Sequence, residues 1–169
     1  CLVSGPHAPL RGSVEVHLLA AARETSRATS CENETEVDFI ARLLPDGPSS
    51  GAVVLTPYAA QCRCFLRKGI VAHTVDSFQG READTVFLSC VRDGCHGIGF
   101  WGEYQRVVVA LTRARVRLVV VASNVRAAWP RDQALTSWLI TEADRTPAIP
   151  GRCTSSGKSH RSPPASDAP

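Results

Sequence analysis

The segment that most constrains the fold is Val116-Arg117-Leu118-Val119-Val120-Val121-Ala122, which is almost uninterrupted in apolar residues. A strand with one face in water alternates apolar and polar side chains, whereas a strand covered on both faces is apolar nearly throughout. Strands of the second kind are typical of parallel sheets that lie between two layers of helices. We therefore expect this segment to form an interior strand of an α/β domain.

Shorter apolar runs alternate with segments of helical length along the rest of the chain. The patterns predict strands over 14–19, 52–55, 71–75, 84–91 and 116–122, and helices over 30–44, 59–68, 107–115 and 132–143. Pro45-Asp46-Gly47-Pro48 is expected to end the first helix by its turn chemistry. This alternation predicts an α/β fold in three layers, with a mostly parallel sheet flanked by helices.

Composition and charge set only broad limits. The chain has 169 residues, 44% of them hydrophobic, and a net charge of +3, which permits a nucleic-acid partner without arguing for one. No apolar run approaches the roughly 20 residues of a membrane-spanning helix. The N-terminus lacks the pattern of a secretory signal peptide. We expect no membrane partner and an intracellular location, cytoplasmic or nuclear.

The two ends of the chain differ in composition from its middle. Residues 1–13 are expected to be an incoming linker, residues 14–145 one domain, and residues 146–169, rich in Pro, Ser and Gly, a disordered tail. Because the chain contains no Met and opens at Cys1, we expect it to be part of a longer protein.

The seven cysteines show no regular spacing. Cys62-x-Cys64 and Cys95-His96 are conceivable metal ligands, but a zinc site usually shows two such pairs at set separations. Reduced thiols in an intracellular protein are the preferred interpretation, and we predict no bound metal in this chain.

Polar segments follow three of the predicted strands, namely Thr56 to Gln61, Asp76 to Glu82 and Ser89 to Arg92. Ligands of parallel α/β sheets bind beyond the carboxyl ends of the strands, so we expect these segments to share one rim. Each taken alone could be an ordinary solvated loop. Gln79-Gly80-Arg81-Glu82 adds a glycine that lets backbone approach a ligand, beside groups that can bind a ribose or a phosphate.

Arg113 and Arg115 stand two residues apart beside an apolar stretch. An arginine held rigidly at a domain edge suits the charge on the γ-phosphate of a nucleotide, usually across an interface. The alternative is the solvent-facing end of a helix, where cations are also favoured.

Four segments occur together in order: His73 to Glu82, Leu88 to Arg92, Gly97 to Phe100 and Val109 to Arg115. They closely resemble motifs V and VI, and the loop between them, of superfamily 1 helicases related to the nonsense-mediated-decay helicase and senataxin. Thr56-Pro57-Tyr58 with Gln61 resembles the segment that precedes motif V, and Asn33 and Glu36 match a short Asn-x-x-Glu helix start. The resemblance covers about residues 14–142.

This resemblance implies the second RecA-like domain of an ATP-driven helicase or translocase on single-stranded RNA or DNA, typically moving 5′ to 3′. In such proteins two RecA-like domains sandwich ATP and Mg²⁺, and the nucleic acid crosses both domains. By resemblance, the residues near the nucleotide are Gly80, Glu82 and Arg113. Arg113 would be the arginine finger. Arg115 would either support Arg113 or only stabilise the fold. The residues at the nucleic acid are Thr56, Tyr58, Thr74 and Ser77, and Gln79 could serve either ligand.

Several family elements are missing from this sequence. It has no phosphate-binding Gly-x-x-x-x-Gly-Lys-Ser/Thr loop, no Asp-Glu box for magnesium and no Gln-Tyr-Arg segment, all of which lie upstream in relatives. We therefore expect ATP and Mg²⁺ to be bound mainly by a first RecA-like domain, and this chain to be inactive alone. Val108 stands where relatives often carry Asn, and Trp101 to Gln105 replaces an Asp-Pro-Arg pattern.

Two other functions remain open at this point. One is a pseudo-helicase that binds nucleic acid or serves as a scaffold without ATP turnover, which the residues at 101–105 and 108 favour slightly. The other is an α/β interaction module with no ATP role, which would make four ordered motifs a coincidence. A viral origin also stays open.

Overall fold

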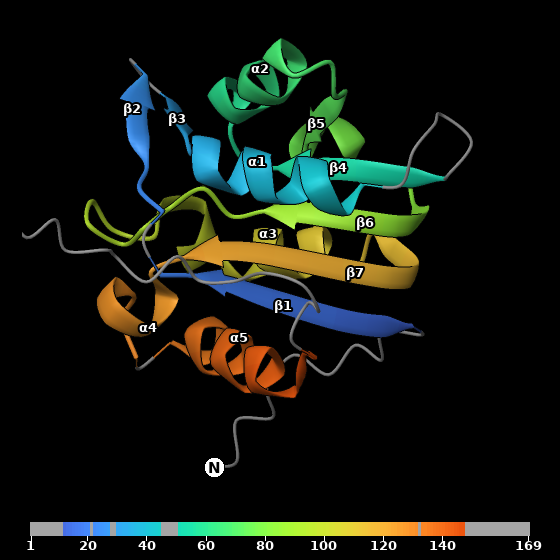
Figure 1. Cartoon of the computed structure of the whole chain (residues 1–169). Coiled ribbons are helices and arrows are strands. Elements are labelled where there is room, and N and C mark those ends of the chain that lie inside the picture. Colours follow the sequence, from blue (N-terminus) through green and yellow to red (C-terminus); the bar gives the residue numbers. More distant parts are fainter. Residues whose placement is uncertain (1–11, 21, 28–29, 45–50, 132, 148–169) are drawn as a thin grey trace, which may run out of the picture.

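The computed structural model describes residues 12–20, 22–27, 30–44, 51–131 and 133–147. Its centre is a sheet of five parallel strands: β1 (Ser13–Leu19), β4 (Ala52–Thr56), β5 (Ala72–Thr74), β6 (Ala83–Ser89) and β7 (Ala114–Ser123). The order across the sheet is β1-β7-β6-β4-β5, so β6 lies in the middle (Figure 1). The predicted α/β fold with a parallel sheet is confirmed.

The apolar segment in β7 lies inside the sheet, as its sequence predicts. β7 pairs with β1 on one side and with β6 on the other, and Val119 stands opposite Glu15 and Phe87. From Leu118 to Ser123 every residue of β7 is buried, whereas the first half of the strand, including Val116, is more exposed. Burial on both faces explains why the second half of β7 carries no alternating polar side chains.

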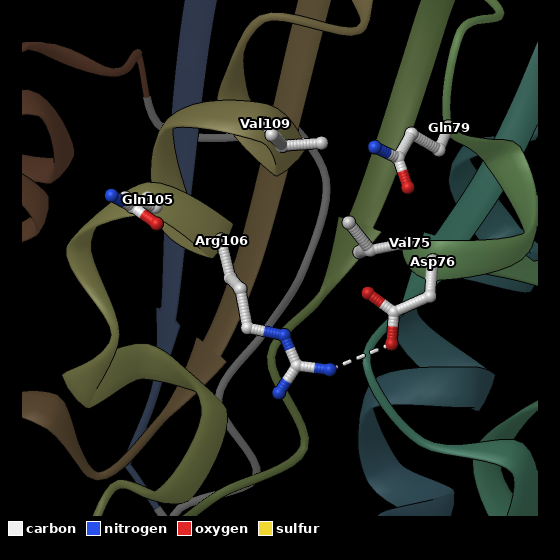
Figure 2. Close-up of a pocket in the computed structure, with 6 residues that line it drawn as sticks. All are labelled: Val75, Asp76, Gln79, Gln105, Arg106 and Val109. Carbon is white, nitrogen blue, oxygen red and sulfur yellow. Dashed lines mark hydrogen bonds and ion pairs between the residues drawn. The ribbon is translucent and has the colours of Figure 1, made fainter.

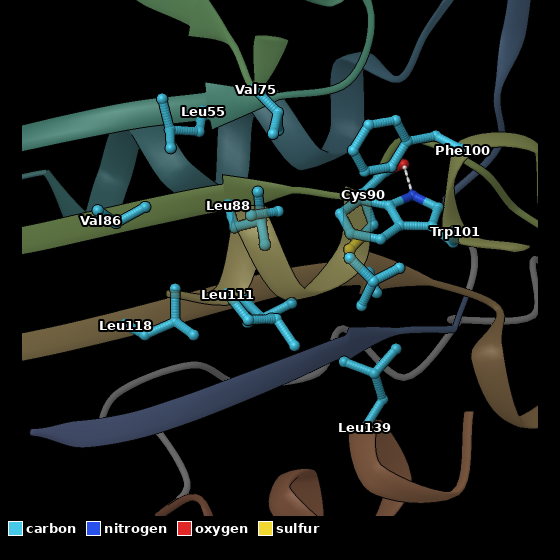
Figure 3. Packing of buried hydrophobic residues seen from close by; sticks show 14 of the residues in the cluster. Leu55, Val75, Val86, Leu88, Cys90, Phe100, Trp101, Leu111, Leu118 and Leu139 are labelled. Carbon is cyan, nitrogen blue, oxygen red and sulfur yellow. Dashed lines mark hydrogen bonds between the residues drawn. The ribbon is translucent and has the colours of Figure 1, made fainter. Parts of the chain in front are cut away.

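Helices cover both faces of the sheet. Successive residues of a strand point to opposite faces, so Phe87 and Val119 pack with α1 (Glu34–Leu43) and α2 (Ala59–Arg67). Their neighbours Leu88 and Leu118 pack on the other face, with α3 (Tyr104–Leu111) and α5 (Ala134–Arg145) (Figure 3). Two separate apolar cores result, one on each side of the sheet, and with them the three layers of a RecA-like domain.

Two predicted helices begin or end in the wrong place. The helix expected over 30–44 starts only at Glu34, because Ser30–Glu32 forms a strand (β3) that pairs antiparallel with β2 (Thr25–Arg27). Asn33 caps α1, accepting a hydrogen bond from the Glu36 amide at 3.3 Å. The helix expected over 107–115 covers Tyr104–Leu111 instead, because the next strand begins already at Ala114.

Three short helical segments complete the fold: η2 (Asp76–Phe78), η3 (Gly99–Gly102) and α4 (Val125–Ala128). The expected linker and tail lie almost entirely outside the described residues. At their boundaries, Ser13 begins β1, and the hydroxyl of Thr146 accepts a hydrogen bond from the Val16 amide at 2.8 Å. Among the described residues, no helix is both long and apolar enough to cross a bilayer.

A buried polar network joins α1 to the carboxyl ends of β6 and β7. The Glu36 carboxylate, which is completely buried, accepts hydrogen bonds from the hydroxyls of Ser89 (2.7 Å) and Ser123 (2.6 Å) and from the Val91 amide (2.8 Å). The side chain of Asn33 donates to the Val91 carbonyl at 3.1 Å. Val91 has φ +69°, which is unusual for a β-branched residue, and these two side chains hold both of its polar groups in place.

Gln61 at the start of α2 extends this network. Its side-chain oxygen accepts from the Asn33 amide at 2.7 Å, and its side-chain nitrogen donates to the Ser89 hydroxyl at 2.9 Å. Gln61 and Ser89 follow predicted strands and were expected on an accessible rim, but both are fully buried. Their polar groups therefore stabilise the junction of α1, α2 and the sheet.

Burial raises the pKa of Glu36 from 4.5 to about 7, against the opposing effect of its hydrogen bonds from Ser123, Ser89 and Val91. A carboxyl with a higher pKa in the folded state favours folding when it is protonated. That contribution is fully present below pH 4.5 and is lost as the pH rises through about 7.

We predict that the free energy of unfolding falls between pH 5 and pH 8 by up to roughly 3 kcal/mol through this group. Glu36→Gln mimics the protonated form and should remove that part of the decline. Urea unfolding of the 169-residue chain and of the variant at both pH values measures the difference. If the free energy of unfolding changed equally with pH in the two proteins, the pKa of Glu36 would be the same in the folded and unfolded states, and the prediction would be contradicted.

Candidate functional site

The candidate residues lie at two opposite edges of the sheet rather than on one rim. Thr56 and Thr74 end β4 and β5, at the carboxyl edge, whereas Gly80 and Glu82 precede β6, at the amino edge. The expectation of a shared rim is wrong for Gly80 to Glu82, because no long helix links β5 to β6. The segment 75–82 is itself the crossover, and it carries the chain from one edge back to the other.

The amino edge brings the two helicase-like motifs into contact. Ala83 pairs with Ala114, and the Ala83 amide donates to the Arg113 carbonyl at 3.0 Å. Arg113 in turn donates from Nη1 to the carbonyl oxygen of Arg81 at 3.3 Å. Residues some 30 positions apart in the sequence therefore form one surface, on which Gly80 and Glu82 are exposed.

Arg113 lies in the short turn between α3 and β7, and its guanidinium is held by three neutral oxygens. Nε donates to the Val109 carbonyl at 2.9 Å, Nη2 to the Thr112 hydroxyl at 3.1 Å, and Nη1 to the Arg81 carbonyl. No carboxylate of the described residues lies within ion-pairing distance of Arg113. Its orientation is fixed while its charge is left without a counter-ion.

The neighbouring arginines differ in this respect. Arg115 pairs with Asp84 of the adjacent strand, with Nε at 2.9 Å and Nη2 at 2.7 Å from the same carboxylate oxygen. Arg106 pairs with Asp76 at 2.7 Å. Arg81 forms no ion pair with a carboxylate of the described chain, and its guanidinium stacks 4.6 Å from the centre of the Phe78 ring. Of these four neighbouring arginines, Arg81 and Arg113 have no carboxylate partner among the described residues, and Arg113 contacts the Arg81 backbone.

An open hollow lies between the crossover segment and α3 (Figure 2). Its walls come from residues 75, 76 and 79 of the crossover and residues 105, 106 and 109 of α3. Figure 2 shows the Arg106–Asp76 ion pair bridging the two walls, with Gln79 and Val109 facing each other further along. The Val109 carbonyl also binds Arg113, so the hollow adjoins the amino-edge surface.

At the carboxyl edge the expected nucleic-acid residues differ in accessibility. Thr56 is completely buried, and its carbonyl accepts a hydrogen bond from the Val75 amide at 3.0 Å. Its hydroxyl is therefore unavailable to a phosphate in this conformation. Thr74 and Ser77 bond to each other: the Thr74 hydroxyl accepts from the Ser77 amide (3.1 Å) and the Ser77 hydroxyl donates to the Thr74 carbonyl (2.9 Å). Ser77 and Gln79 are exposed.

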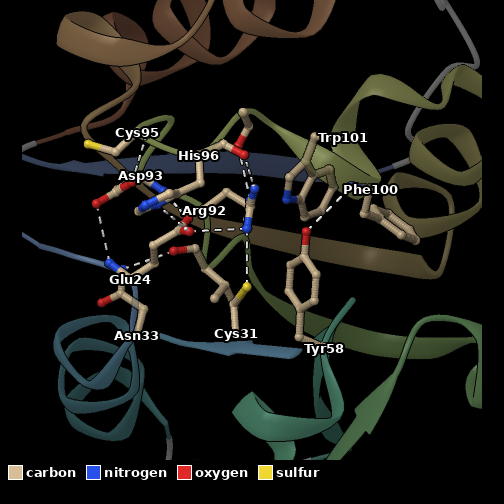
Figure 4. Close-up of polar contacts among 12 residues, drawn as sticks. Glu24, Cys31, Asn33, Tyr58, Arg92, Asp93, Cys95, His96, Phe100 and Trp101 are labelled. Atoms are coloured by element: carbon tan, nitrogen blue, oxygen red, sulfur yellow. Dashed lines mark hydrogen bonds and ion pairs between the residues drawn. The ribbon is translucent and has the colours of Figure 1, made fainter. Parts of the chain in front are cut away.

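Tyr58 supports the loop that follows β6. Its hydroxyl oxygen accepts from the Phe100 amide at 3.4 Å, and burial raises the pKa of this half-buried phenol (Figure 4). Trp101, part of the departure from the family pattern, is buried and donates to the Cys90 carbonyl at 2.8 Å (Figure 3). Within the altered segment only Trp101 packs into the core, whereas residues 102–105 are exposed. Val108 is half-buried on α3, and its carbonyl accepts from the Thr112 hydroxyl.

Arg92 is a structural residue that the sequence analysis did not single out. Its guanidinium donates to the Gly97 carbonyl (3.0 Å), to Glu24 (3.1 Å) and to the sulfur of Cys31 (3.1 Å), so it ties the loop to β3 (Figure 4). Glu24 is almost completely buried. Its partner lies 68 positions away, so no local pattern could have indicated the pair.

The cysteines that could suggest a metal site are spread over the domain. Cys62 and Cys64 lie on α2, and burial raises the pKa of both thiols. Within the described chain, Glu24, Asp93 and His96 are near enough together to share a cation. Their carboxylates already bind the Arg92 guanidinium and the amides of Glu24, Asp93 and Cys95. This cluster is therefore satisfied by the protein itself.

Comparison with known proteins agrees with the geometry. The family model described as an AAA domain matches residues 12–125. A regulator of nonsense transcripts 1 homolog from Arabidopsis thaliana is 39% identical over 118 residues, which is 59% of this chain and 9% of the relative. Helicase sen1 from Schizosaccharomyces pombe is 37% identical over 119 residues (59% of this chain, 7% of the relative). ATP-dependent helicase upf1 from the same organism is 34% identical over 108 residues (58% and 12%).

The chain spans only a small part of the length of these relatives. A match over residues 12–125 includes the crossover segment, α3 and the Arg113 turn. The chain belongs to the AAA domain family, as a superfamily 1 helicase domain of the nonsense-mediated-decay helicase and senataxin group.

Proposed function

We propose that this chain is the second of two RecA-like domains of an ATP-dependent helicase or translocase acting on single-stranded RNA or DNA inside the cell. In this role it supplies an arginine finger to ATP hydrolysis and part of the nucleic-acid track. The observation that carries the proposal is the Arg113 guanidinium, held by three neutral oxygens beside Gly80 and Glu82 with no carboxylate partner.

An arginine finger must be oriented before the phosphate arrives and must keep its charge for it. A guanidinium has five N–H donors. Three of those on Arg113 are engaged by Val109, Thr112 and Arg81, so two remain for phosphate oxygens. An ion pair such as that of Arg115 with Asp84 would instead have to be broken first.

The neighbouring motif residues suit the rest of a nucleotide. Gly80 has φ +77°, and no atom lies within 4 Å of the position a Cβ would take there. Its backbone is therefore open to close approach by a ligand. Glu82 is exposed and can accept hydrogen bonds from ribose hydroxyls. Magnesium, and the loop that binds the β-phosphate, would belong to the first RecA-like domain.

For the nucleic acid we propose the surface formed by Thr74, Ser77 and Gln79. These side chains are polar and uncharged, and Ser77 and Gln79 are exposed. Hydroxyl and amide groups of this kind bind phosphates and sugars and carry little sequence information. The surface therefore suits a motor that steps along any sequence. Tyr58 contributes by holding the loop around Phe100.

The crossover segment offers a route for coupling the two edges. The first part of this segment, next to Thr74, contains Ser77 of the proposed nucleic-acid surface. Its last part contains Arg81, whose carbonyl binds Arg113. Closure of the cleft on ATP would engage Arg113 at the γ-phosphate, and hydrolysis would release it. Displacement of Arg113 and Arg81 would then move Ser77 and Gln79 along the single-stranded nucleic acid.

The first test is the ATPase rate of the full-length protein with and without single-stranded RNA or DNA. We expect strong stimulation by at least one polymer, and the stronger response identifies the preferred track. Binding of nucleic acid with no ATP turnover would contradict the proposed motor function and support the pseudo-helicase alternative. Val108→Asn in α3 would then be the first variant to test for restored turnover.

We predict that Arg113→Ala in the full-length protein lowers ATP turnover by about 10³-fold, as arginine fingers typically contribute 10³ or more. Arg126→Ala is the matched control, since the side chain of this exposed arginine on α4 pairs with Asp144, and the Arg131 guanidinium binds only its backbone carbonyl, which the variant keeps. Steady-state ATP hydrolysis at saturating nucleic acid measures both variants. Turnover of Arg113→Ala within a few-fold of the control would remove the role assigned to Arg113.

A further inference from the structure

We propose that Thr112 is a positioning residue that holds the Arg113 guanidinium in the orientation required for phosphate. This inference rests on the proposed function, because it assigns a role to Thr112 only through Arg113. It concerns a hydroxyl that touches no nucleotide itself and that lies at the end of α3, where a threonine could otherwise serve only to end a helix.

The hydrogen bonds of Thr112 fix the direction in which its oxygen points. The hydroxyl lies 2.8 Å from the Val108 carbonyl and 3.1 Å from Nη2 of Arg113. A hydroxyl has a single proton, and a carbonyl can only accept, so that proton goes to Val108. The oxygen must then accept from Arg113. The Val108 carbonyl, which also accepts from the Thr112 amide at 3.0 Å, thus holds the hydroxyl with its oxygen directed at the guanidinium.

Val109 and Thr112 together orient the planar group. Nε binds the Val109 carbonyl at 2.9 Å and Nη2 binds the Thr112 oxygen at 3.1 Å, so one edge of the guanidinium lies against the last turn of α3. The opposite end, with Nη1 and the second proton of Nη2, is left for a ligand and is touched only by the Arg81 carbonyl at 3.3 Å. Two nitrogens side by side are the arrangement that binds phosphate oxygens in pairs.

Of the three acceptors, only that of Thr112 belongs to a side chain. The carbonyls of Val109 and Arg81 belong to the backbone and are kept in any variant. The Thr112 acceptor is also neutral, so it fixes the arginine without lowering its charge, which an aspartate there would do. Long arginine side chains have considerable rotamer freedom, and restricting it in advance lowers the cost of reaching the transition state.

The test compares Thr112→Val with Thr112→Ser in the full-length protein, with ATP turnover stimulated by single-stranded RNA or DNA. Valine keeps the shape and loses the oxygen, whereas serine keeps the oxygen. We expect Thr112→Val to lower kcat by about 10-fold, within the loss of up to 10²-fold that misplacement of a catalytic group causes. KM for ATP should change less than kcat, and Thr112→Ser should restore most of the turnover.

A double-mutant cycle separates positioning from a merely structural role. If Thr112 acts through Arg113, Thr112→Val lowers kcat in the parent protein but not in the Arg113→Ala background. An equal loss in both backgrounds, or a Thr112→Ser variant as slow as Thr112→Val, would overturn the inference, as would wild-type turnover of Thr112→Val. The proposed function fails separately, when Arg113→Ala itself keeps full turnover.

Discussion

The pairing of β6 with β7 is the interaction on which the rest of the structure depends. These two strands run side by side from Ala83 and Ala114 to Ser89 and Val121, at the centre of the sheet. At their amino ends the pairing places Arg113 against Arg81. At their carboxyl ends it brings the hydroxyls of Ser89 and Ser123 to the single carboxylate of Glu36. One strand pair therefore organises both the charged surface and the buried polar network.

The electrostatics of the amino edge distinguish two kinds of arginine. Arg106, Arg115 and Arg117 each pair with a carboxylate, which neutralises their charge within the fold. Arg113 is held only by neutral oxygens, and the domain thereby keeps a partly buried cation without a carboxylate partner near Gly80. We propose that this rigid placement without neutralisation suits Arg113 to bind a phosphate.

Much of the fold could be predicted because its signals are local. The apolar run in β7 and the alternation of strands with helices required a parallel sheet in layers, and the motif Asn33-x-x-Glu36 marked the start of α1 correctly. The β2–β3 hairpin escaped prediction because its strands have three residues each and carry polar side chains. Ser30–Glu32 therefore read as the first turn of a helix.

The site was predicted less completely because its geometry depends on long-range packing. Arg113 and Gly80 were singled out by resemblance, and their roles stay predictions. The sequence also suggested that Gly80 to Glu82 lie at the carboxyl edge of the sheet, since nothing local shows that the chain returns to the amino edge without a helix. The burial of Thr56 depends on tertiary packing, which no local pattern shows. The acceptors around Arg113 are mostly backbone carbonyls, which every residue has and no motif can display.

The most direct test of this account is a structure of the full-length protein with single-stranded RNA, ADP and aluminium fluoride, a mimic of the transferring γ-phosphate. The account predicts the Nη1–Nη2 end of Arg113 on the fluoride, with Nε still on the Val109 carbonyl and Nη2 still on the Thr112 hydroxyl. A fluoride bound instead by Arg81 or Arg115, with Arg113 directed away from the nucleotide, would contradict it.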